Sequence, residues 1–334
     1  MNPARKLPEH IRKNGPLTVA RYMALCNAHY YGTRDPLGMQ GDFTTSPEIS
    51  QIFGELIGAW MSDTWERAGS PRGLLCELGP GRGTLMKDAL RATHRHKPFH
   101  DNIAIRMIET SPHLRAVQQE HLSAAYPRIS WHDTLESLPP LPLFLIANEF
   151  FDALPVHQYI RIRGTEEERK IDYREGSFCW ADNGEVIREA SPDSIAIVKQ
   201  IAAHIKVYGG AALIIDYGYV NGSHGDTLQA VRHHAFTDVL RSPGEADLTA
   251  HVDFKALKDA AEKERVQVWG PTEQGVFLKR LGGELRAAAL CENAPLESRN
   301  IILSGLERLV APHQMGELFK VLAITSTLDK PAGF

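Results

Sequence analysis

The sequence contains few cysteines. Its 334 residues include four, at widely separated positions: Cys26, Cys76, Cys179 and Cys291. This spacing provides neither the dense framework of a disulfide-rich secreted protein nor the paired ligands of a structural zinc site. We therefore expect free thiols in or near the hydrophobic core, and a reducing compartment.

Long hydrophobic runs and a strong net charge are also absent. The longest mostly apolar stretch, residues 138–148, contains three prolines and is far shorter than the roughly 18 apolar residues that a membrane span requires. Lysine and arginine number 37 against 41 aspartates and glutamates, so the net charge of −4 provides no overall attraction to nucleic acid or anionic membranes. We expect no membrane span and no nucleic-acid partner.

The N-terminus does not have the pattern of a secretory signal. Its basic residues are not followed by an apolar segment, and Glu9 together with the prolines at positions 3 and 8 disfavours an organellar presequence. The cytoplasm is therefore the expected location.

Several catalytic motifs are missing as well. The chain has no H-E-x-x-H zinc motif, no G-x-S-x-G nucleophile elbow and no Walker phosphate loop. The histidines at 233, 234 and 251 show no recognised metal-ligand spacing, so we expect them at the surface or in loops and predict no metal site.

The composition is that of an enzyme-sized globular protein. Apolar residues make up 43% of the chain and charged residues 23%, enough for one large or two moderate cores. From about residue 73, short apolar runs alternate with helical segments, a pattern typical of a parallel sheet with helices on both faces. The predicted strands are Gly73–Leu78, Ile103–Glu109, Arg128–His132, Leu143–Asn148 and Ala211–Asp216, with later candidates at Arg265–Trp269 and Phe319–Thr325.

The first 70 residues predict two helices around a polar loop. Residues 16–30 place apolar side chains at helical spacing, with Pro16 in the first turn. A second helix is predicted to begin with Ser46 as its cap and to continue without interruption to Trp60. The glycine-containing loop 38–46 lies between them.

Two regions interrupt the alternation of strands and helices. Residues 156–183 alternate apolar and polar side chains, which predicts an antiparallel hairpin or meander beside the sheet, and a helix follows near residues 193–207. Residues 270–316 are predicted to be mostly helical. We therefore expect an N-terminal helical segment, residues 1–70, and a domain of residues 71–334 that carries inserts at about 156–210 and 219–316.

The first predicted strand leads into a glycine-rich turn. Glu77 is followed by Gly79, Gly81 and Gly83, and a helix opens after them. Such glycines allow sharp turns and close approach to a ligand, but the spacing is neither the dinucleotide G-x-G-x-x-G pattern nor a phosphate loop. A carboxylate before the turn repels a pyrophosphate and attracts an ammonium or sulfonium group, both present in S-adenosylmethionine. The alternative is an ordinary strand–turn–helix connection without a ligand.

Acidic residues follow the next two strands. Glu109 is placed to accept hydrogen bonds from both ribose hydroxyls of a bound nucleoside, as acids at this position do in nucleotide-binding α/β folds. Asp133 is a candidate contact to the adenine edge. An acid at a strand end is about as often the cap of the next helix, so both interpretations of Asp133 remain open.

The fourth strand ends in a polar and aromatic cluster. Asn148, Glu149, Phe150, Phe151 and Asp152 are consecutive, at the position that faces the reactive end of a cofactor bound over the first strand. Glu149 and Asp152 could accept guanidinium hydrogen bonds in a fixed geometry, and one of them could take up a proton late in the reaction. Alternatively, the two carboxylates cap a helix and the two aromatic rings pack in a core.

These segments resemble the signature blocks of the MidA-like methyltransferases, a family that includes the mitochondrial arginine methyltransferase serving respiratory complex I assembly. The resemblance covers nearly the whole chain, with blocks at residues 41–50, 53–55, 77–83, 148–155, 216–218 and 273–278. It implies a seven-stranded class I methyltransferase fold, S-adenosylmethionine as methyl donor, and methylation of an arginine in a complex I subunit.

Carried over position by position, the resemblance implies roles for individual residues. The donor-site positions are Glu77, Gly79, Gly81, Gly83 and Glu109, with Asp133 as the further adenine candidate. The acceptor-side positions are Glu149 and Asp152, with Asn148 beside them. We also expect the loop from Asp42 to Ser46 to cover the amino-acid end of the donor, because the amides of Thr45 and Ser46 precede a helix N-terminus that could bind its carboxylate.

The sequence does not define the client arginine, the number of methyl groups transferred or the oligomeric state. Two alternatives remain: an assembly chaperone that binds the donor without turnover, and a methyltransferase for a small metabolite. The leading hypothesis is a protein-arginine N-methyltransferase that acts on a complex I subunit, in the bacterial cytoplasm or, for a eukaryotic source, in the mitochondrial matrix.

Overall fold

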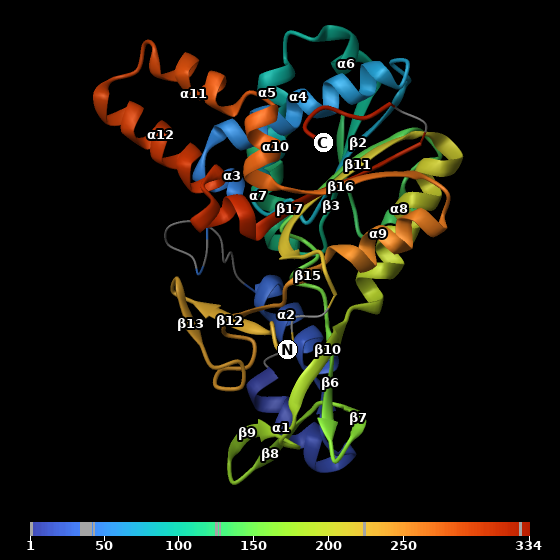
Figure 1. Ribbon diagram of the computed structural model, residues 1–334, viewed down its shortest axis with the longest axis vertical. Coiled ribbons are helices and arrows are strands. Elements are labelled where there is room, and N and C mark those ends of the chain that lie inside the picture. Colours follow the sequence, from blue (N-terminus) through green and yellow to red (C-terminus); the bar gives the residue numbers. More distant parts are fainter. Residues whose placement is uncertain are drawn as a thin grey trace.

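The structure is a computed structural model that describes residues 3–33, 42, 44–123, 126, 128–222, 225–326 and 329–334. The molecule is elongated, with an α/β unit at one end and small antiparallel sheets at the other (Figure 1). Of the predicted loop 38–46, Asp42 and residues 44–46 are described, and the rest lies outside the described residues.

A mostly parallel sheet forms the centre of the α/β unit. Its strand order is β4-β3-β2-β5-β11-β17-β16, β17 runs antiparallel to both neighbours, and the short strand β15 pairs with β11. The strands are β2 (Gly73–Leu78), β3 (Ile103–Ile108), β4 (Ile129–His132), β5 (Leu143–Asn148), β11 (Gly210–Tyr219), β15 (Val252–Asp253), β16 (Gln267–Glu273) and β17 (Phe319–Thr325). The predicted strands and the predicted α/β class are confirmed, with β15 as an addition.

Apolar side chains of these strands build two layers of core. Successive side chains of a strand point to opposite faces, so Leu75 belongs to one layer and Leu74 to the other. The first layer includes side chains of α4 (Gln51–Arg67), α5 (Thr84–Thr93), α10 (Gln274–Arg280), α11 (Gly283–Cys291) and α12 (Leu296–Val310). The second includes side chains of α8 (Pro192–Tyr208) and α9 (Phe254–Lys263). Further connections contain α6 (Lys97–Asn102), α7 (Pro112–Leu122) and the 3-10 turn η1 (Leu135–Ser137).

Helix α2 begins later than predicted. It spans Val19–Thr33, because Leu17–Thr18 form the short strand β1, which pairs with β8 (Lys170–Arg174). Pro16 therefore precedes a strand and does not start the helix.

The predicted continuous helix from Ser46 is interrupted. Ser50 is extended, with φ −156° and ψ 132°, and separates α3 (Ser46–Ile49) from α4. Its hydroxyl accepts a hydrogen bond from the N–H of Ile52 and so caps α4. Thr45 occupies the cap position of α3, so the prediction of one helix capped by Ser46 is wrong.

The predicted antiparallel insert is confirmed at the end of the molecule that carries the N-terminal helix α1 (Pro3–Asn14) (Figure 1). Together with β8, its strands are β6 (His157–Ile162), β7 (Thr165–Glu168), β9 (Ser177–Trp180) and β10 (Glu185–Ala190). They form two sheets, of orders β10-β6-β7 and β1-β8-β9. The N-terminal segment is thus joined to the insert through β1.

The region 219–316 contains more than helices. A third small sheet has the order β13-β12-β14, formed by β12 (Gln229–Arg232), β13 (Ala235–Thr237) and β14 (Asp247–Thr249). The chain then returns to the central fold through α9 and β16 before α10, α11, α12 and the π-helical turn η2 (Pro312–Gly316). The mostly helical character of residues 270–316 is confirmed, and the division into domains stays a prediction.

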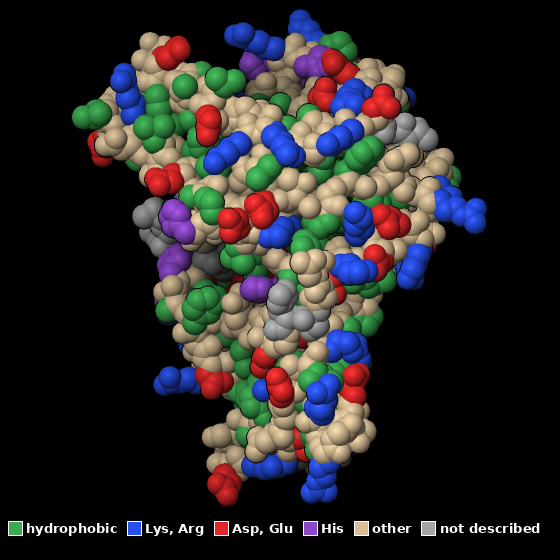
Figure 2. Space-filling model, viewed as in Figure 1, with side chains coloured by type: hydrophobic (Ala, Val, Ile, Leu, Met, Phe, Trp, Pro, Cys, Tyr) green, Lys and Arg blue, Asp and Glu red, His purple; other side chains and the backbone are tan. Residues whose placement is uncertain are grey.

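In the part of the chain that the structure describes, no helix combines the length and apolar character needed to cross a membrane. Figure 2 shows basic and acidic side chains intermixed over one face of the molecule. This mixture agrees with the nearly balanced charge of the sequence.

Candidate active site

The carboxyl ends of the central strands open onto a cavity of about 870 Å³. Its walls contain residues that follow β2, β3 and β5, and residues of α2, α3, β11, β14 and η2. Parallel strands bring their carboxyl ends to one edge of the sheet, where α/β folds bind ligands. The predicted site residues that line the cavity are Thr45, Glu77, Gly79, Gly81, Glu109, Asn148, Glu149 and Asp152.

The turn after β2 adopts a backbone that favours glycine. Gly79, Gly81 and Gly83 have φ values of 58°, 53° and 80°. A Cβ atom at Gly79 would lie 2.8 Å from the ring of Phe150, so the turn packs directly against the segment after β5. Gly83 is the cap residue of α5 and does not line the cavity; a Cβ there would lie 3.1 Å from Leu122.

Glu77 is in β2, two residues before the first glycine of this turn. Its side chain is 3% exposed and lines the cavity, and its Oε2 atom has no hydrogen-bond partner among the described residues. Burial raises the pKa of this carboxyl to about 8. A buried carboxylate oxygen without a partner is unfavourable, so the position suits a ligand that supplies a positive charge.

Glu109 is anchored at the end of the neighbouring strand. Its Oε1 accepts a hydrogen bond from the N–H of Ser111 at 2.7 Å, and its Oε2 lies 3.4 Å from the donating Nε2 of Gln118. The same Nε2 donates to the carbonyl of Gly81 at 2.7 Å. Gln118 therefore links the glycine turn to Glu109, while burial raises the pKa of the Glu109 carboxyl.

Asp133 lies apart from the other predicted residues. Its side chain is 78% exposed, and its Oδ1 is 2.6 Å from the guanidinium of Arg115. Asp133 does not line the cavity, whereas Ser111 and Leu114 do. The predicted contact with adenine has no support from this position, because Arg115 holds the carboxylate at the surface.

The segment after β5 turns sharply and directs Glu149 into the cavity. Glu149 has φ 49°, a left-handed conformation that is uncommon for a residue with a side chain. Asp216 stabilises the turn, because its Oδ2 accepts hydrogen bonds from three consecutive backbone N–H groups. These belong to Phe150, Phe151 and Asp152, at 3.2, 2.9 and 3.2 Å.

Glu149 is joined to the first residue of α3. Its Oε1 accepts hydrogen bonds from the backbone N–H of Ser46 at 2.8 Å and from Nδ2 of Asn148 at 3.1 Å. Burial raises the pKa of Glu149, and these bonds oppose the increase. The Ser46 amide thus donates to Glu149, and its expected contact with the ligand carboxylate stays a prediction. Thr45 lines the cavity, and Phe43 of the predicted lid lies outside the described residues.

Two site residues carry no signal in the sequence. Asp247 of β14 is 4% exposed, and its Oδ1 accepts a hydrogen bond from the hydroxyl of Tyr31 of α2 at 2.6 Å. Burial raises the pKa of Asp247 to about 7. Burial, followed by repulsion from Asp247 and Glu149, raises the pKa of Asp152 to about 8. Neither Tyr31 nor Asp247 belongs to a local motif, so only the folded chain brings them to the site.

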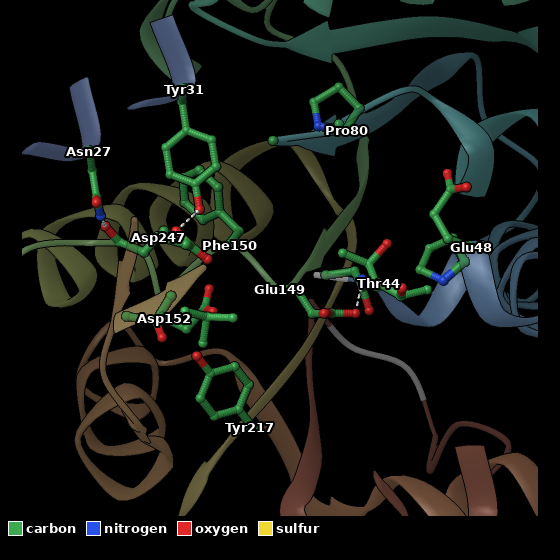
Figure 3. Close-up of a pocket in the computed structure, with 18 of the residues that line it drawn as sticks. Asn27, Tyr31, Thr44, Glu48, Pro80, Glu149, Phe150, Asp152, Tyr217 and Asp247 are labelled. Atoms are coloured by element: carbon green, nitrogen blue, oxygen red, sulfur yellow. Dashed lines mark hydrogen bonds between the residues drawn. The ribbon is translucent and has the colours of Figure 1, made fainter. Parts of the chain in front are cut away.

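Figure 3 shows two groups of residues on opposite sides of Glu149. One group consists of Tyr31, Asp152, Tyr217 and Asp247, and the other of Thr44 and Glu48, while Pro80 of the glycine turn lies above Glu149 in this view. Glu149 therefore lies beside a cluster of acidic and phenolic groups, in the same cavity as the glycine turn.

Unpaired buried oxygens indicate the kind of ligand that fits. Glu77 Oε2, Asn148 Oδ1 and Asp152 Oδ1 are buried without a hydrogen-bond partner in the described ranges, and all three residues line the cavity. Such acceptors favour ligands with N–H groups or positive charge. S-adenosylmethionine carries an ammonium group and a sulfonium, so the residues present fit this cofactor.

Sequence comparisons relate the chain to methyltransferases. The family described as "Putative S-adenosyl-L-methionine-dependent methyltransferase" matches residues 56–272. "Protein arginine methyltransferase NDUFAF7 homolog, mitochondrial" from Drosophila melanogaster is 40% identical, over 96% of this chain and 84% of that protein. "Protein arginine methyltransferase NDUFAF7, mitochondrial" from Homo sapiens is 36% identical, over 96% of this chain and 82% of that protein.

A solved structure agrees with this relationship. The crystal structure of a Burkholderia thailandensis protein bound to S-adenosyl-homocysteine has a TM-score of 0.84 and 26% identity, over 99% of this chain and 93% of that chain. The expected methyltransferase fold and the expected cofactor are thereby confirmed. The chain belongs to the family of S-adenosyl-L-methionine-dependent methyltransferases.

Proposed function

We propose that the protein transfers methyl groups from S-adenosylmethionine to arginine side chains of a protein substrate. The observation that carries the proposal is the position of Glu149 and Asp152, two carboxylates that share one cavity with the glycine turn. Arginine is the side chain whose N–H groups best match carboxylates in a fixed geometry. The names of the relatives, protein arginine methyltransferases, support the same substrate class.

The cofactor would be held by the first two strand ends. Glu77 would accept hydrogen bonds from the ammonium group, and Glu109 from the ribose hydroxyls. Gly79 and Gly81 would allow the backbone to approach without steric conflict. When bound, S-adenosylmethionine supplies a methyl group carried by a positively charged sulfur.

The acceptor would be held by the residues after β5. Glu149 and Asp152 would orient the guanidinium by accepting its N–H groups, which fixes the direction of the reacting nitrogen. The Phe150 ring lines the same cavity and would exclude water. Asp152, whose pKa is raised to about 8, is suited to accept the proton that the nitrogen gives up after methylation.

The proposal also includes the identity of the protein substrate and the compartment in which the protein acts. The family resemblance supports a complex I subunit as substrate. The names of the relatives, which include "mitochondrial", support the mitochondrial matrix for a eukaryotic source. A bacterial cytoplasmic location stays a prediction.

Isothermal titration with S-adenosylmethionine tests the cofactor part. The unaltered protein should bind, and Glu77→Ala should weaken binding at least tenfold, because a charge-assisted partner of the ammonium group is lost (about 1.5–3 kcal/mol). No binding by the unaltered protein would contradict the proposal.

Mass spectrometry tests the transfer. Proteins from cells with the gene should contain methylated arginine at a position that is unmethylated in cells without it. Unchanged arginine masses in a protein that binds the donor would instead support a chaperone without turnover.

A further inference from the structure

The cavity contains a second acidic position, outside the segment after β5. Asp247 lies on β14, in the small sheet between the central fold and the insert, yet it lines the same cavity as Glu149. Its side chain is 4% exposed, and its Oδ1 accepts a hydrogen bond from the neutral hydroxyl of Tyr31 at 2.6 Å. Tyr31 orients this carboxylate without neutralising its charge.

Asp152 provides an independent sign that a ligand binds here. Its side chain is 7% exposed, and its Oδ1 atom is buried with no hydrogen-bond partner in the described structure. Figure 3 shows Asp152, Asp247 and Tyr31 together on one side of Glu149, opposite Thr44 and Glu48. The unpartnered oxygen therefore lies beside a second buried carboxylate in the same cavity.

Arg308 lines this cavity and favours the charged form of Glu149, whereas Asp152 and Asp247 have no ion-pair partner in the described part of the chain. Among the described residues, no lysine or arginine forms an ion pair within 4.0 Å of Asp152 or Asp247. Asp247 and Glu149 each disfavour ionisation of Asp152. Buried carboxylates in such proximity are unfavourable unless a cation joins them. A purely structural position would be served as well by asparagine, which has nearly the same size and no charge.

We propose that Asp247, oriented by Tyr31 and acting with Asp152, binds the guanidinium group of the acceptor and selects arginine over uncharged side chains. This assignment rests on the proposed function and adds a specificity residue to it. A guanidinium has five N–H donors in one plane, so carboxylates at different edges can bind it at the same time. Glu149, which lines the cavity together with this cluster and the glycine turn, would then face the nitrogen nearest the donor.

The test uses Nα-acetyl-arginine amide as probe and Nα-acetyl-citrulline amide as its uncharged counterpart. Binding to the protein saturated with S-adenosyl-homocysteine is followed by isothermal titration or by NMR. The unaltered protein should prefer the arginine probe at least tenfold. Asp247→Asn should lose this preference while its affinity for S-adenosyl-homocysteine stays within twofold.

Two further variants make the result specific. Tyr31→Phe should keep part of the preference, because the carboxylate remains and only its orienting hydroxyl is lost. Asp226→Asn is the matched control; Asp226 pairs with Arg169 outside the cavity and should leave both affinities unchanged. Thermal unfolding and S-adenosyl-homocysteine binding establish that each variant is folded.

Each outcome has a separate meaning. Retention of the arginine preference by folded Asp247→Asn, or absence of any preference in the unaltered protein, would overturn the assignment. In either case binding of the donor product can persist, and mass spectrometry of cellular arginine methylation decides the proposed function independently. If the protein prefers the arginine probe but transfers no methyl group, the guanidinium site is supported and the proposed methyltransferase activity is refuted.

Discussion

Three carboxyl groups of the cavity resist ionisation in the free protein. The pKa values of Glu77, Asp152 and Asp247 are raised to about 8, 8 and 7, in each case first by burial. A cation that binds beside such a group favours its charged form. Ligand binding and proton release are therefore coupled at this site, and the coupling gives two predictions.

The first prediction concerns Glu77→Gln. An unfolded glutamate has a pKa of about 4.3, so between roughly pH 4 and 8 the folded protein binds the extra proton and loses stability as the pH rises. The variant lacks this loss. Its ligand-free melting temperature should exceed that of the unaltered protein by roughly 2 °C or more at pH 8 and by less at pH 5. Scanning calorimetry at both pH values measures this, and an equal difference at the two would contradict it.

The second prediction concerns the pH dependence of acceptor binding. Asp247 and Asp152 lose their protons over the range set by their pKa values of about 7 and 8. Affinity for Nα-acetyl-arginine amide should therefore increase from pH 6 to pH 9. If binding releases one proton, the affinity rises by roughly tenfold with each pH unit. Titration across this range tests the direction. An affinity that does not change with pH, or that decreases as the pH rises, would show that these carboxylates do not bind the probe.

Some site residues could be predicted from the sequence because each lies at the carboxyl end of a predicted strand or directly after it. Glu77, Glu109 and Glu149 have this position in common, and the fold brings them to one edge of the sheet. Asp133 has the same sequence signal, but a long-range ion pair with Arg115 holds it at the surface. Nothing in the sequence shows that α7 will present that arginine.

On the scale of secondary-structure elements, the turn after β5 depends on a residue of β11. Asp216 accepts hydrogen bonds from three backbone N–H groups of this turn. Its own side chain does not line the cavity. Asp216 is the last residue of the predicted strand Ala211–Asp216, so its location at the edge of the sheet was predictable. Its role was not, because the pairing of β5 with β11 comes only from the folded sheet.

The third prediction is that Asp216→Asn uncouples binding from turnover. Both oxygens of Asp216 accept backbone N–H groups, so the NH2 group of an asparagine would replace one acceptor and should cost about 1–3 kcal/mol of unfolding free energy. The turn that directs Glu149 should relax, and kcat should fall by roughly tenfold to a hundredfold, while donor affinity stays within twofold. Steady-state kinetics and titration separate these effects. A loss confined to donor affinity would contradict the positioning role.

The fourth prediction concerns the contact between α4 and α5. A Cβ atom at Gly58 would lie 2.5 Å from the Cα of Ala89, so Gly58→Ala should destabilise the protein by about 1–3 kcal/mol. A Cβ atom at Gly32 in α2 would meet no atom of the described residues within 4 Å, and Gly32→Ala should be neutral or stabilise by up to about 1 kcal/mol. Denaturant unfolding compares the two, and equal effects would contradict the close helix packing.

The elements themselves were predictable to different degrees. Apolar runs such as Leu143–Asn148 define the core strands, because they are buried on both faces of the sheet. The short strands β12, β13 and β14 have no comparable run and form by pairing with one another. Ser50 interrupts an apolar stripe that remains continuous in sequence, so periodicity alone could not reveal the break.

On the scale of the whole molecule, the site is assembled from both ends of the chain and from its centre. Helix α2 contributes Tyr31, β14 contributes Asp247, and η2 contributes Met315 to the wall of the same cavity. The carboxyl ends of the central strands line the same cavity. The sequence predicts the sheet, but the closure of the cavity depends on long-range contacts that no local pattern encodes.

A structure of the protein in complex with S-adenosyl-homocysteine tests the central claim most directly. We expect the amino group of the ligand at Glu77 and its sulfur on the side of the cavity where Glu149 and Asp152 lie. A ligand whose sulfur faces away from both carboxylates, or whose amino group avoids Glu77, would contradict the account.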